Sequence, residues 1–508
     1  MAWRITVSMR TLWPIFFLAL AWSVGPALGP ILDGQLIGHG MTDLYPSVWG
    51  LWAFAEGQPD LPGHTALLGH PDGMGFYYSS PIKGWIAWPL IPLIGLPATW
   101  NGLLIASRFA TVACSYGAAR AWGLGSSGSL AAAALYGASP FFHGYAVEGI
   151  AEGTDGWTLA LWLWALGAKR FRLAALPFAL TILSSWYLGM TACLLAALAL
   201  VWNRKVAWSG LGLLIISPAL FQFTAAFPGA GPLSPEIRQA MGASLTVPTP
   251  GWKDGLNPFA INAYIGFTAA AAALMSRTRW VLAAAIPALL SLGIGPIYEL
   301  PIAELVRFPY RWHAATLVLL APAVAITAER LRWGHFLGPI IVLEGLALSP
   351  VEPILPGADA ELPAYTRHIT GPVLELPGPV AMAPGEVNRS RRRAQYILYH
   401  QVAHGQPSPW VPDFNAVGVR AWTPTDAIAA LQQMDPLVSP RDQPLQPILR
   451  DIPADHVVIQ KRHMGPQRTQ TASVALRQSG WDLTFDDDTV SIYSRPGSRS
   501  GSASKNAP

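Results

Sequence analysis

The feature that most constrains this chain is a series of long apolar runs that contain almost no charged residues. The first covers roughly residues 11–32, and similar runs recur through the first two thirds of the sequence. Runs of about 17–25 such residues are typical of transmembrane helices. Charged residues make up only 12% of the chain, which is about half the share found in soluble domains. The sequence therefore predicts a polytopic membrane protein.

The first apolar run has two interpretations, a cleaved signal peptide or a retained first span. It is longer than an ordinary signal core, and no clear small-residue cleavage site precedes the polar segment that follows it, so a retained span is favoured. The net charge of +4 is small and indicates no nucleic-acid partner. Cys114 and Cys193 lie inside apolar runs, where they are typical of packing residues without disulfide or metal spacing.

The positions of basic residues predict the orientation of the chain. Arg4 and Arg10 precede the first span, which places the N-terminus in the cytoplasm and Asp43 outside. The later basic clusters are also cytoplasmic under one particular placement of spans. These spans are 100–119, 128–145, 156–168, 171–186, 189–203, 206–226, 258–276, 280–296, 312–328 and 335–350. Together with the first run they make about eleven transmembrane helices, although the short runs also allow a merged pair.

Residues 82–98 are apolar enough to span, but prolines and a glycine interrupt them. Counting them as a span would invert the following loops, so we interpret them as an interfacial or re-entrant segment. The outer side then receives a first external loop, residues 33–82, together with 146–155, 227–257, 297–311 and everything after about residue 350. The domain prediction is a transmembrane domain over residues 1–350.

After Val351 the composition becomes richer in Pro, Asp, Arg and Gln. Strand-like segments occur at 371–378, 455–460 and 488–496, and helical stretches at SRRRAQYILYHQVAHG and 424–435, where Thr423 or Thr425 is the candidate cap. This order predicts a small extracytoplasmic α/β domain over residues 351–496. The end of the chain, residues 497–508, has a low-complexity composition that predicts disorder.

Four polar clusters gather on the predicted outer side. The first is Asp43, and the others are GHPDGMGFYYSSPIKG (69–84), FFHGYAVEGIAEGTDGW (141–157) and YELPIAELVRFPYRWH (298–313). Their candidate side chains are ionisable groups and tyrosines: His70, Asp72, Tyr77, Tyr78, Lys83, His143, Glu148, Glu152, Asp155, Glu299, Glu304, Arg307, Tyr310 and Arg311. Carboxylates and arginines on one rim of a helical bundle favour acid/base chemistry and phosphate binding.

Each cluster also has a purely structural interpretation. Asp43 is equally consistent with an interfacial loop residue or a helix cap, and Asp72 in its Pro–Asp–Gly turn is more typical of a turn former. The acidic residues of 141–157 fit a solvated loop, and Arg307 and Arg311 fit arginines that extend to lipid headgroups. Their shared side of the membrane is what favours the functional interpretation.

Several motifs in this order resemble the GT-C superfamily of polytopic glycosyltransferases, in particular its large bacterial membrane-protein branch. They are TDLYPSVWGLW after the first span, HPDGMGFYYSSP before a proline-rich apolar segment, RFPYRW late in the bundle, and VLELP, ILYHQVAHGQP and DHVVIQK in the tail. The resemblance covers nearly the whole chain, but its motifs tolerate many substitutions. It implies a multi-pass protein of the bacterial plasma membrane.

The resemblance also implies roles for individual residues. In the superfamily a sugar is typically transferred from a polyisoprenyl phosphate on the outer face, with a first-loop acid as general base. That role falls on Asp43, with inversion at the sugar carbon. Lys83, Arg307, Tyr310 and Arg311 would bind the donor phosphate. The acceptor-side or supporting residues would be His70, Asp72, Tyr77, Tyr78, His143, Glu148, Glu152 and Asp155.

The sequence itself identifies no certain cofactor. Some members of the superfamily hold a divalent metal such as Mg²⁺ or Mn²⁺ with the first-loop acid, and many carry a second acid directly beside it. Here Thr42 and Leu44 flank Asp43, so a metal-binding pair is not evident. The acceptor is not identified either.

Two other functions remain open. A transporter or flippase of an envelope precursor would place ionisable residues at mid-membrane, whereas here the spans contain few charges beyond Arg108 and Glu344. A non-catalytic envelope assembly protein would use its tail to bind a partner, and its role would not depend on Asp43.

Overall fold

The computed structural model describes residues 9–40, 42–57, 64–76, 78–226, 242–243, 259–294, 308–376, 398–409, 449–450 and 452–497. The chain divides into two compact units. Unit 1 comprises Met1–Ser47, Tyr78–Phe221 and Pro232–Ala360, and unit 2 comprises Val48–Tyr77, Gln222–Gly231 and Glu361–Pro508. The C-terminal segment of unit 2 begins at Glu361, ten residues after the composition changes at Val351. Unit 2 also includes most of the predicted first external loop, residues 33–82.

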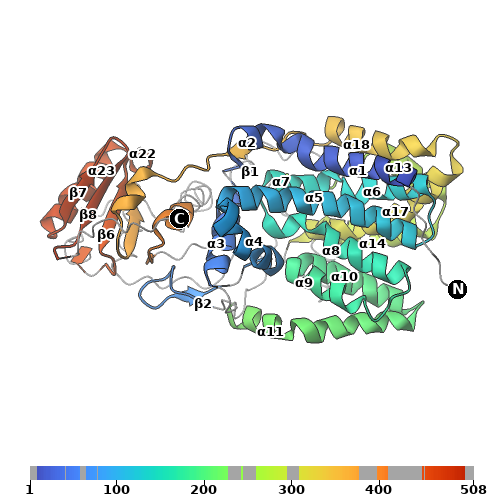
Figure 1. Cartoon of the computed structure of the whole chain (residues 1–508), viewed down its shortest axis with the longest axis horizontal. Helices are drawn as coiled ribbons and strands as arrows, with labels where there is room; N and C mark the ends of the chain where they lie inside the picture. The colour runs from blue at the N-terminus through green and yellow to red at the C-terminus, as the bar shows by residue number, and fades with distance from the viewer. Residues whose placement is uncertain are drawn as a thin grey trace. The chain divides into compact units, whose positions relative to one another are not determined.

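Unit 1 is built of helices (Figure 1). They are α1 (Met9–Val24), α2 (Leu28–Leu32), α4 (Pro81–Ile94), α5 (Leu96–Ala121), α6 (Ser126–Gly137), α7 (Pro140–Val147), α8 (Gly156–Gly167), α9 (Ala175–Ser184), α10 (Trp186–Leu200), α11 (Leu211–Ala226), α13 (Phe267–Ser276), α14 (Arg279–Ser291), α17 (His313–Arg330) and α18 (Leu337–Leu348). Strands β1 (Leu36–Ile37) and β4 (Gly357–Ala358) pair antiparallel.

Three helical stretches in the described part of the chain are long and apolar enough to cross a membrane: Trp13–Leu32, Leu96–Ala121 and Pro309–Arg330. The other apolar helices are shorter, with Ala175–Ser184, Trp186–Leu200, Phe267–Ser276, Arg279–Ser291 and Gly334–Leu348 among them. The chain is therefore a membrane protein with a mostly helical fold, while the count of about eleven spans remains a prediction.

Local chemistry explains why some predicted spans are divided. The predicted span 128–145 is two helices, because Pro140 starts α7 and the Ser139 side chain accepts a hydrogen bond from the Phe142 amide. The two predicted spans 171–186 and 189–203 do form separate helices, because Ser185 has an extended backbone and its hydroxyl accepts from the Leu188 amide at the start of α10. The predicted interfacial segment 82–98 covers most of α4, a 14-residue helix with two internal prolines, and the first residues of α5.

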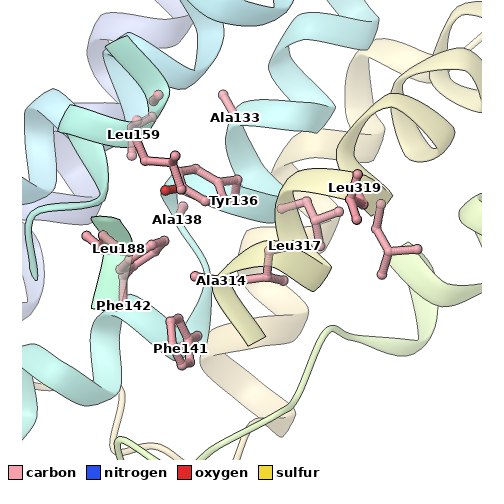
Figure 2. Packing of buried hydrophobic residues seen from close by; sticks show 14 of the residues in the cluster. Ala133, Tyr136, Ala138, Phe141, Phe142, Leu159, Leu188, Ala314, Leu317 and Leu319 are labelled. Atoms are coloured by element: carbon pink, nitrogen blue, oxygen red, sulfur yellow. The ribbon is translucent and has the colours of Figure 1, made fainter. Parts of the chain in front are cut away.

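Small residues let the central helices of unit 1 pack closely. A Cβ atom on Gly137 of α6 would lie 2.6 Å from the Cα atom of Val112 of α5, a separation that only glycine permits. Aromatic rings fill the space beside this crossing, with the Tyr136 and Phe142 rings 5.0 Å apart. Figure 2 shows these rings together with Leu317 of α17 in the same buried cluster. Small residues at helix crossings are a common way to pack helices in membranes.

The charged side chain of Glu344 in α18 has a structural role. Its carboxylate accepts hydrogen bonds from the backbone amides of Phe267 and Thr268 and, at 2.9 Å, from the Tyr264 hydroxyl. These amides belong to the first turn of α13, where backbone N–H groups have no partner within the helix. Glu344 therefore caps α13. Of the two charged residues that the sequence analysis weighed for a transport function, Arg108 and Glu344, the second thus has a structural explanation.

Unit 2 contains a four-stranded sheet with the order β5-β6-β8-β7. The strands are β5 (Val373–Leu376), β6 (His456–Gln460), β7 (Asp482–Asp486) and β8 (Val490–Ser494); β5 and β6 are parallel and the other pairs antiparallel. Helix α23 (Pro466–Gln478) covers the sheet and buries Leu476 with Trp481. The strands predicted within 371–378, 455–460 and 488–496 are confirmed, while β7 and α23 were not predicted.

The remaining part of unit 2 joins α3 (Leu44–Glu56) to a hairpin of β2 (His64–Thr65) and β3 (Met74–Gly75). Gln401 connects them: its Oε1 accepts from Trp49 Nε1 at 2.8 Å, and its Nε2 donates to the Leu67 carbonyl at 2.6 Å. Residues 398–404 are helical, as predicted. The predicted helix 424–435, with Thr423 and Thr425, and residues 498–508 lie outside the described residues.

Candidate functional site

Asp43 immediately precedes α3 and is half-buried. The loop that carries it is held against residues 147–149 of unit 1. The His39 amide donates to the Val147 carbonyl at 2.7 Å, and the Thr42 hydroxyl donates to the Glu148 carbonyl at 2.7 Å. The structure therefore brings the first-loop acid beside the acidic segment 141–157, although the two are about one hundred residues apart in sequence.

The Lys83 ammonium is buried in unit 1 and fully used by protein partners. It lies 3.1 Å from Asp155 Oδ1, donates to the Thr154 hydroxyl at 2.6 Å, and donates to the Ala151 carbonyl. An ammonium has three N–H donors, so none remains for a ligand. The prediction that Lys83 binds donor phosphate is therefore not carried further; Lys83 anchors α4 to the 3₁₀ turn η2 (Ala151–Thr154).

Asp155 is saturated in the same way. Its Oδ1 accepts from the Ser107 hydroxyl at 2.8 Å and from Trp157 Nε1 at 3.2 Å, and its Oδ2 accepts from the Ser80 hydroxyl at 2.9 Å. Its side chain is 2% exposed. A carboxylate with this many protein donors is held in one position and has little capacity for a substrate. We therefore interpret Asp155 as a residue that holds the surrounding segments in place.

Glu152 and Arg311 form a second ion pair that remains partly accessible. Arg311 Nη1 lies 3.3 Å from Glu152 Oε1, and the two side chains are 8% and 14% exposed. The Ser79 hydroxyl donates to Glu152 Oε2 at 2.9 Å, and Arg311 Nε donates to the Tyr310 hydroxyl at 3.1 Å. The third nitrogen, Nη2, has no hydrogen-bond partner among the described residues. Arg311 as a whole is buried, at 7% exposure, but Nη2 is not among the fully buried atoms without a partner.

Aromatic rings surround the Arg311 guanidinium. Its carbon lies 3.5 Å from the centre of the Tyr187 ring and 5.0 Å from that of Phe308, with Tyr145 and Tyr310 at 5.9 and 5.5 Å. Such cation–π contacts stabilise and orient a guanidinium. Tyr187 was not among the predicted site residues, because it lies between two predicted spans and outside the four polar clusters.

Two further predicted residues are built into the helical bundle nearby. Glu148 is fully buried, and its Oε1 accepts from the Phe259 amide at 2.9 Å. His143 Nε2 lies 2.7 Å from the Glu352 carbonyl, and its ring lies 5.2 Å from Trp22. Both therefore hold segments of unit 1 together. We assign neither to direct contact with an acceptor.

Tyr78 lies at the start of the segment that carries Ser79 and Ser80. Burial, followed by the nearby charges of Glu152 and Asp155, raises the pKa of Tyr78 well above its ordinary value of 10. Its hydroxyl therefore keeps its proton at every physiological pH and can act as a hydrogen-bond donor.

Other predicted residues lie elsewhere. His70 and Asp72 belong to unit 2, where the His70 amide donates to the Ser408 carbonyl at 3.0 Å and Asp72 is exposed in a turn. This supports the turn-forming interpretation of Asp72. Tyr77 and Arg307 lie outside the described residues, as do Glu299 and Glu304. Over the described ranges no group of three or more His, Cys, Asp or Glu side chains has metal-binding geometry.

The fold of the chain was compared with those of known proteins. No family model and no curated protein sequence matches the chain. Among solved structures it resembles the arabinofuranosyltransferase AftD from Mycobacteria, with a TM-score of 0.57 and 17% identity over 96% of this chain and 40% of AftD. It also resembles the Archaeoglobus fulgidus oligosaccharyltransferase, with a TM-score of 0.51 and 12% identity over 95% of this chain and 73% of that one.

The chain thus spans less than half the length of AftD. At these identities the comparison concerns the fold alone. Both neighbours have the GT-C fold, so the resemblance predicted from the sequence motifs is confirmed at that level.

Proposed function

We propose that this chain, which has the GT-C fold, is a membrane glycosyltransferase that transfers a sugar from a polyisoprenyl phosphate to an acceptor on the extracytoplasmic face. Two structural neighbours named for transferring sugars support the general activity. The observation that carries the proposal is the Glu152–Arg311 pair, with Nη2 of Arg311 still able to donate, in the same unit as Asp43 and its anchored loop.

In the proposed reaction Asp43 accepts the proton of an acceptor hydroxyl as that oxygen attacks the anomeric carbon of the donor sugar. The bond between this carbon and the phosphate oxygen breaks, and its electron pair leaves with the lipid phosphate. The two oxygens occupy opposite faces of the sugar, so the configuration inverts. A carboxylate base in this role contributes about 10²–10⁴ in rate.

Arg311 supplies the positive charge that this departure requires. Nη2 donates to a phosphate oxygen, while Glu152 and the Tyr187 ring fix the guanidinium in advance. A preorganised cation in a water-poor site stabilises developing negative charge without reorganisation. Arg307 and Tyr77 keep the donor and acceptor roles given to them by the motif resemblance. The described residues provide no group of three or more His, Cys, Asp or Glu side chains for Mg²⁺ or Mn²⁺, and a chelator added to the assay below tests for a metal requirement.

The test compares two neighbouring acids in membranes that contain the full chain. Asp43→Asn should reduce sugar transfer from a labelled pool of polyisoprenyl-phosphate sugars at least about a hundredfold. Asp33, an exposed residue directly after α2, provides the matched control, and Asp33→Asn should transfer at the wild-type rate. Both proteins should insert into the membrane in equal amounts.

Transfer by the Asp43→Asn protein at the rate of the Asp33→Asn protein would contradict the proposal. It would leave a GT-C-fold membrane protein whose first-loop acid has a structural role.

A further inference from the structure

The part of the sequence between Asp155 and Glu236 has an unusual charge distribution. From Gly156 to Pro235 the sequence contains five basic residues and no Asp or Glu. The basic residues are Lys169, Arg170, Arg172, Arg204 and Lys205. They fall in two loops, one between α8 and α9 and one between α10 and α11. No acid within this part of the chain can neutralise them.

The structure brings these two loops together. The Arg172 guanidinium carbon lies 5.0 Å from the centre of the Trp208 ring, which joins the first loop to the second. The second loop is held against α8: Val206 is buried, and Trp162 Nε1 of α8 donates to the Ser209 hydroxyl at 3.0 Å. Asn203 Oδ1 accepts from the Lys205 amide at 3.1 Å. The loops therefore form one defined surface, which we call the basic rim (residues 169–173 and 201–208).

The five cations of the basic rim lie on the protein surface. Lys169, Arg170, Arg172, Arg204 and Lys205 are all exposed, and none of them forms an ion pair with an acidic residue described by the structure. Lys169 adopts a left-handed conformation with φ of 58°, which more often selects glycine or asparagine at a helix C-terminus. The chain thus places a lysine at this position despite an unfavourable backbone geometry.

Large apolar side chains alternate with these cations. Val201 is 78% exposed and Trp202 is 72% exposed, and Leu173 and Trp208 are also exposed. Tryptophan at the polar–apolar boundary, next to lysine and arginine, is typical of the membrane interface. A surface that bound only a soluble acidic protein would not need this apolar component.

We propose that the basic rim is a binding site for the headgroup of an anionic phospholipid. Arg170, Arg204 and Lys205 bind the phosphate, and Trp202 lies among the upper acyl carbons. Clustered basic residues at a membrane surface are attracted to anionic lipids, and the attraction is screened by salt. This site is separate from the proposed sugar-transfer site and does not depend on it.

The test uses the purified full chain and native mass spectrometry in detergent with added phosphatidylglycerol, at low ionic strength. The triple variant Arg170→Gln, Arg204→Gln, Lys205→Gln should bind this lipid at least about tenfold more weakly than the wild type. A matched triple variant neutralises three exposed arginines of unit 2, Arg367→Gln, Arg462→Gln and Arg477→Gln, and should bind as the wild type does.

Two further arms identify the chemistry. Phosphatidylcholine should bind equally weakly to the wild type and both triple variants, because its headgroup is neutral overall. Inorganic phosphate should displace phosphatidylglycerol poorly, because it lacks the acyl chains that contact Trp202. The proposal is overturned if the basic-rim variant retains phosphatidylglycerol as the wild type does, or if inorganic phosphate or polyglutamate displaces the lipid completely.

Discussion

At the scale of single residues, the number of hydrogen-bond partners separates supporting groups from reactive ones. Lys83 and Asp155 have their donors and acceptors filled by the protein, whereas Glu152 is partly exposed and Arg311, although buried, keeps one nitrogen without a described partner. The sequence placed the four in three polar clusters on the same predicted side of the membrane, and the structure pairs Lys83 with Asp155 and Arg311 with Glu152. The sequence could not rank them, because ranking depends on Ser80, Ser107 and other partners that only folding brings together.

The buried pair makes a residue-scale prediction about stability. Lys83→Met should leave the Asp155 carboxylate buried without its cation and should cost about 3–5 kcal/mol of stability. Thermal unfolding in lipid-free detergent measures this cost. The exposed Lys205→Met variant should change stability by less than about 0.5 kcal/mol. Equal melting temperatures for the two variants would show that the Lys83–Asp155 contact is not a buried ion pair.

Glu375 of β5 gives unit 2 a defined pH dependence. Burial alone would raise the pKa of Glu375, but His400, 3.3 Å away, and His404, 3.8 Å away, lower it to about 2. A depressed carboxyl pKa stabilises the fold above the ordinary value near 4.5, and this contribution is lost as the pH falls from there toward 2. The protection factors of the amides of β5 and β6 in the full chain, which are corrected for the intrinsic exchange rate at each pH, should therefore fall over this range.

The matched variant is Glu375→Gln, which has no carboxyl group to titrate. Subtracting its exchange profile removes the contribution of the other acids of unit 2. The account of Glu375 is wrong if the difference between the wild type and the variant is independent of pH between 5 and 2.

At the scale of helices and strands, apolar length predicted where helices occur but not where they end. The run 128–145 carries no charge that would mark a boundary, and its division depends on the local pair Ser139 and Pro140. Strand β7 was not predicted, because its side chains are mostly exposed. The sheet pattern of alternating burial is therefore missing from it.

Gln401 provides a prediction at this scale, because one side chain joins α3, the β2–β3 segment and residues 398–404. Gln401→Ala would leave the Trp49 Nε1 and the Leu67 carbonyl without this partner, at a cost of about 1–3 kcal/mol for each buried group. Amide exchange should increase in 48–57 and 64–70. Gln478→Ala, at an exposed position of α23, should leave these segments unchanged, and an identical profile for both variants would rule out the connecting role.

At the scale of the whole molecule, the sequence predicted the membrane class, the GT-C resemblance and the C-terminal sheet. The number of spans and their sidedness stay predictions, because three described helices satisfy the length and composition of a span while the others are shorter. The domain boundary differs for a physical reason: residues 48–77 are far from the tail in sequence, but Gln401 and Ser408 bind their backbone and side chains within unit 2.

The most direct test of the account is a cryo-EM structure of the full chain in lipid nanodiscs with an added polyisoprenyl phosphate. We expect the phosphate within about 3 Å of Arg311 Nη2, a hydrogen-bonding distance, and the Asp43 carboxylate facing the same cavity. A phosphate bound away from Arg311, with Asp43 directed into bulk water, would contradict the proposed sugar-transfer site.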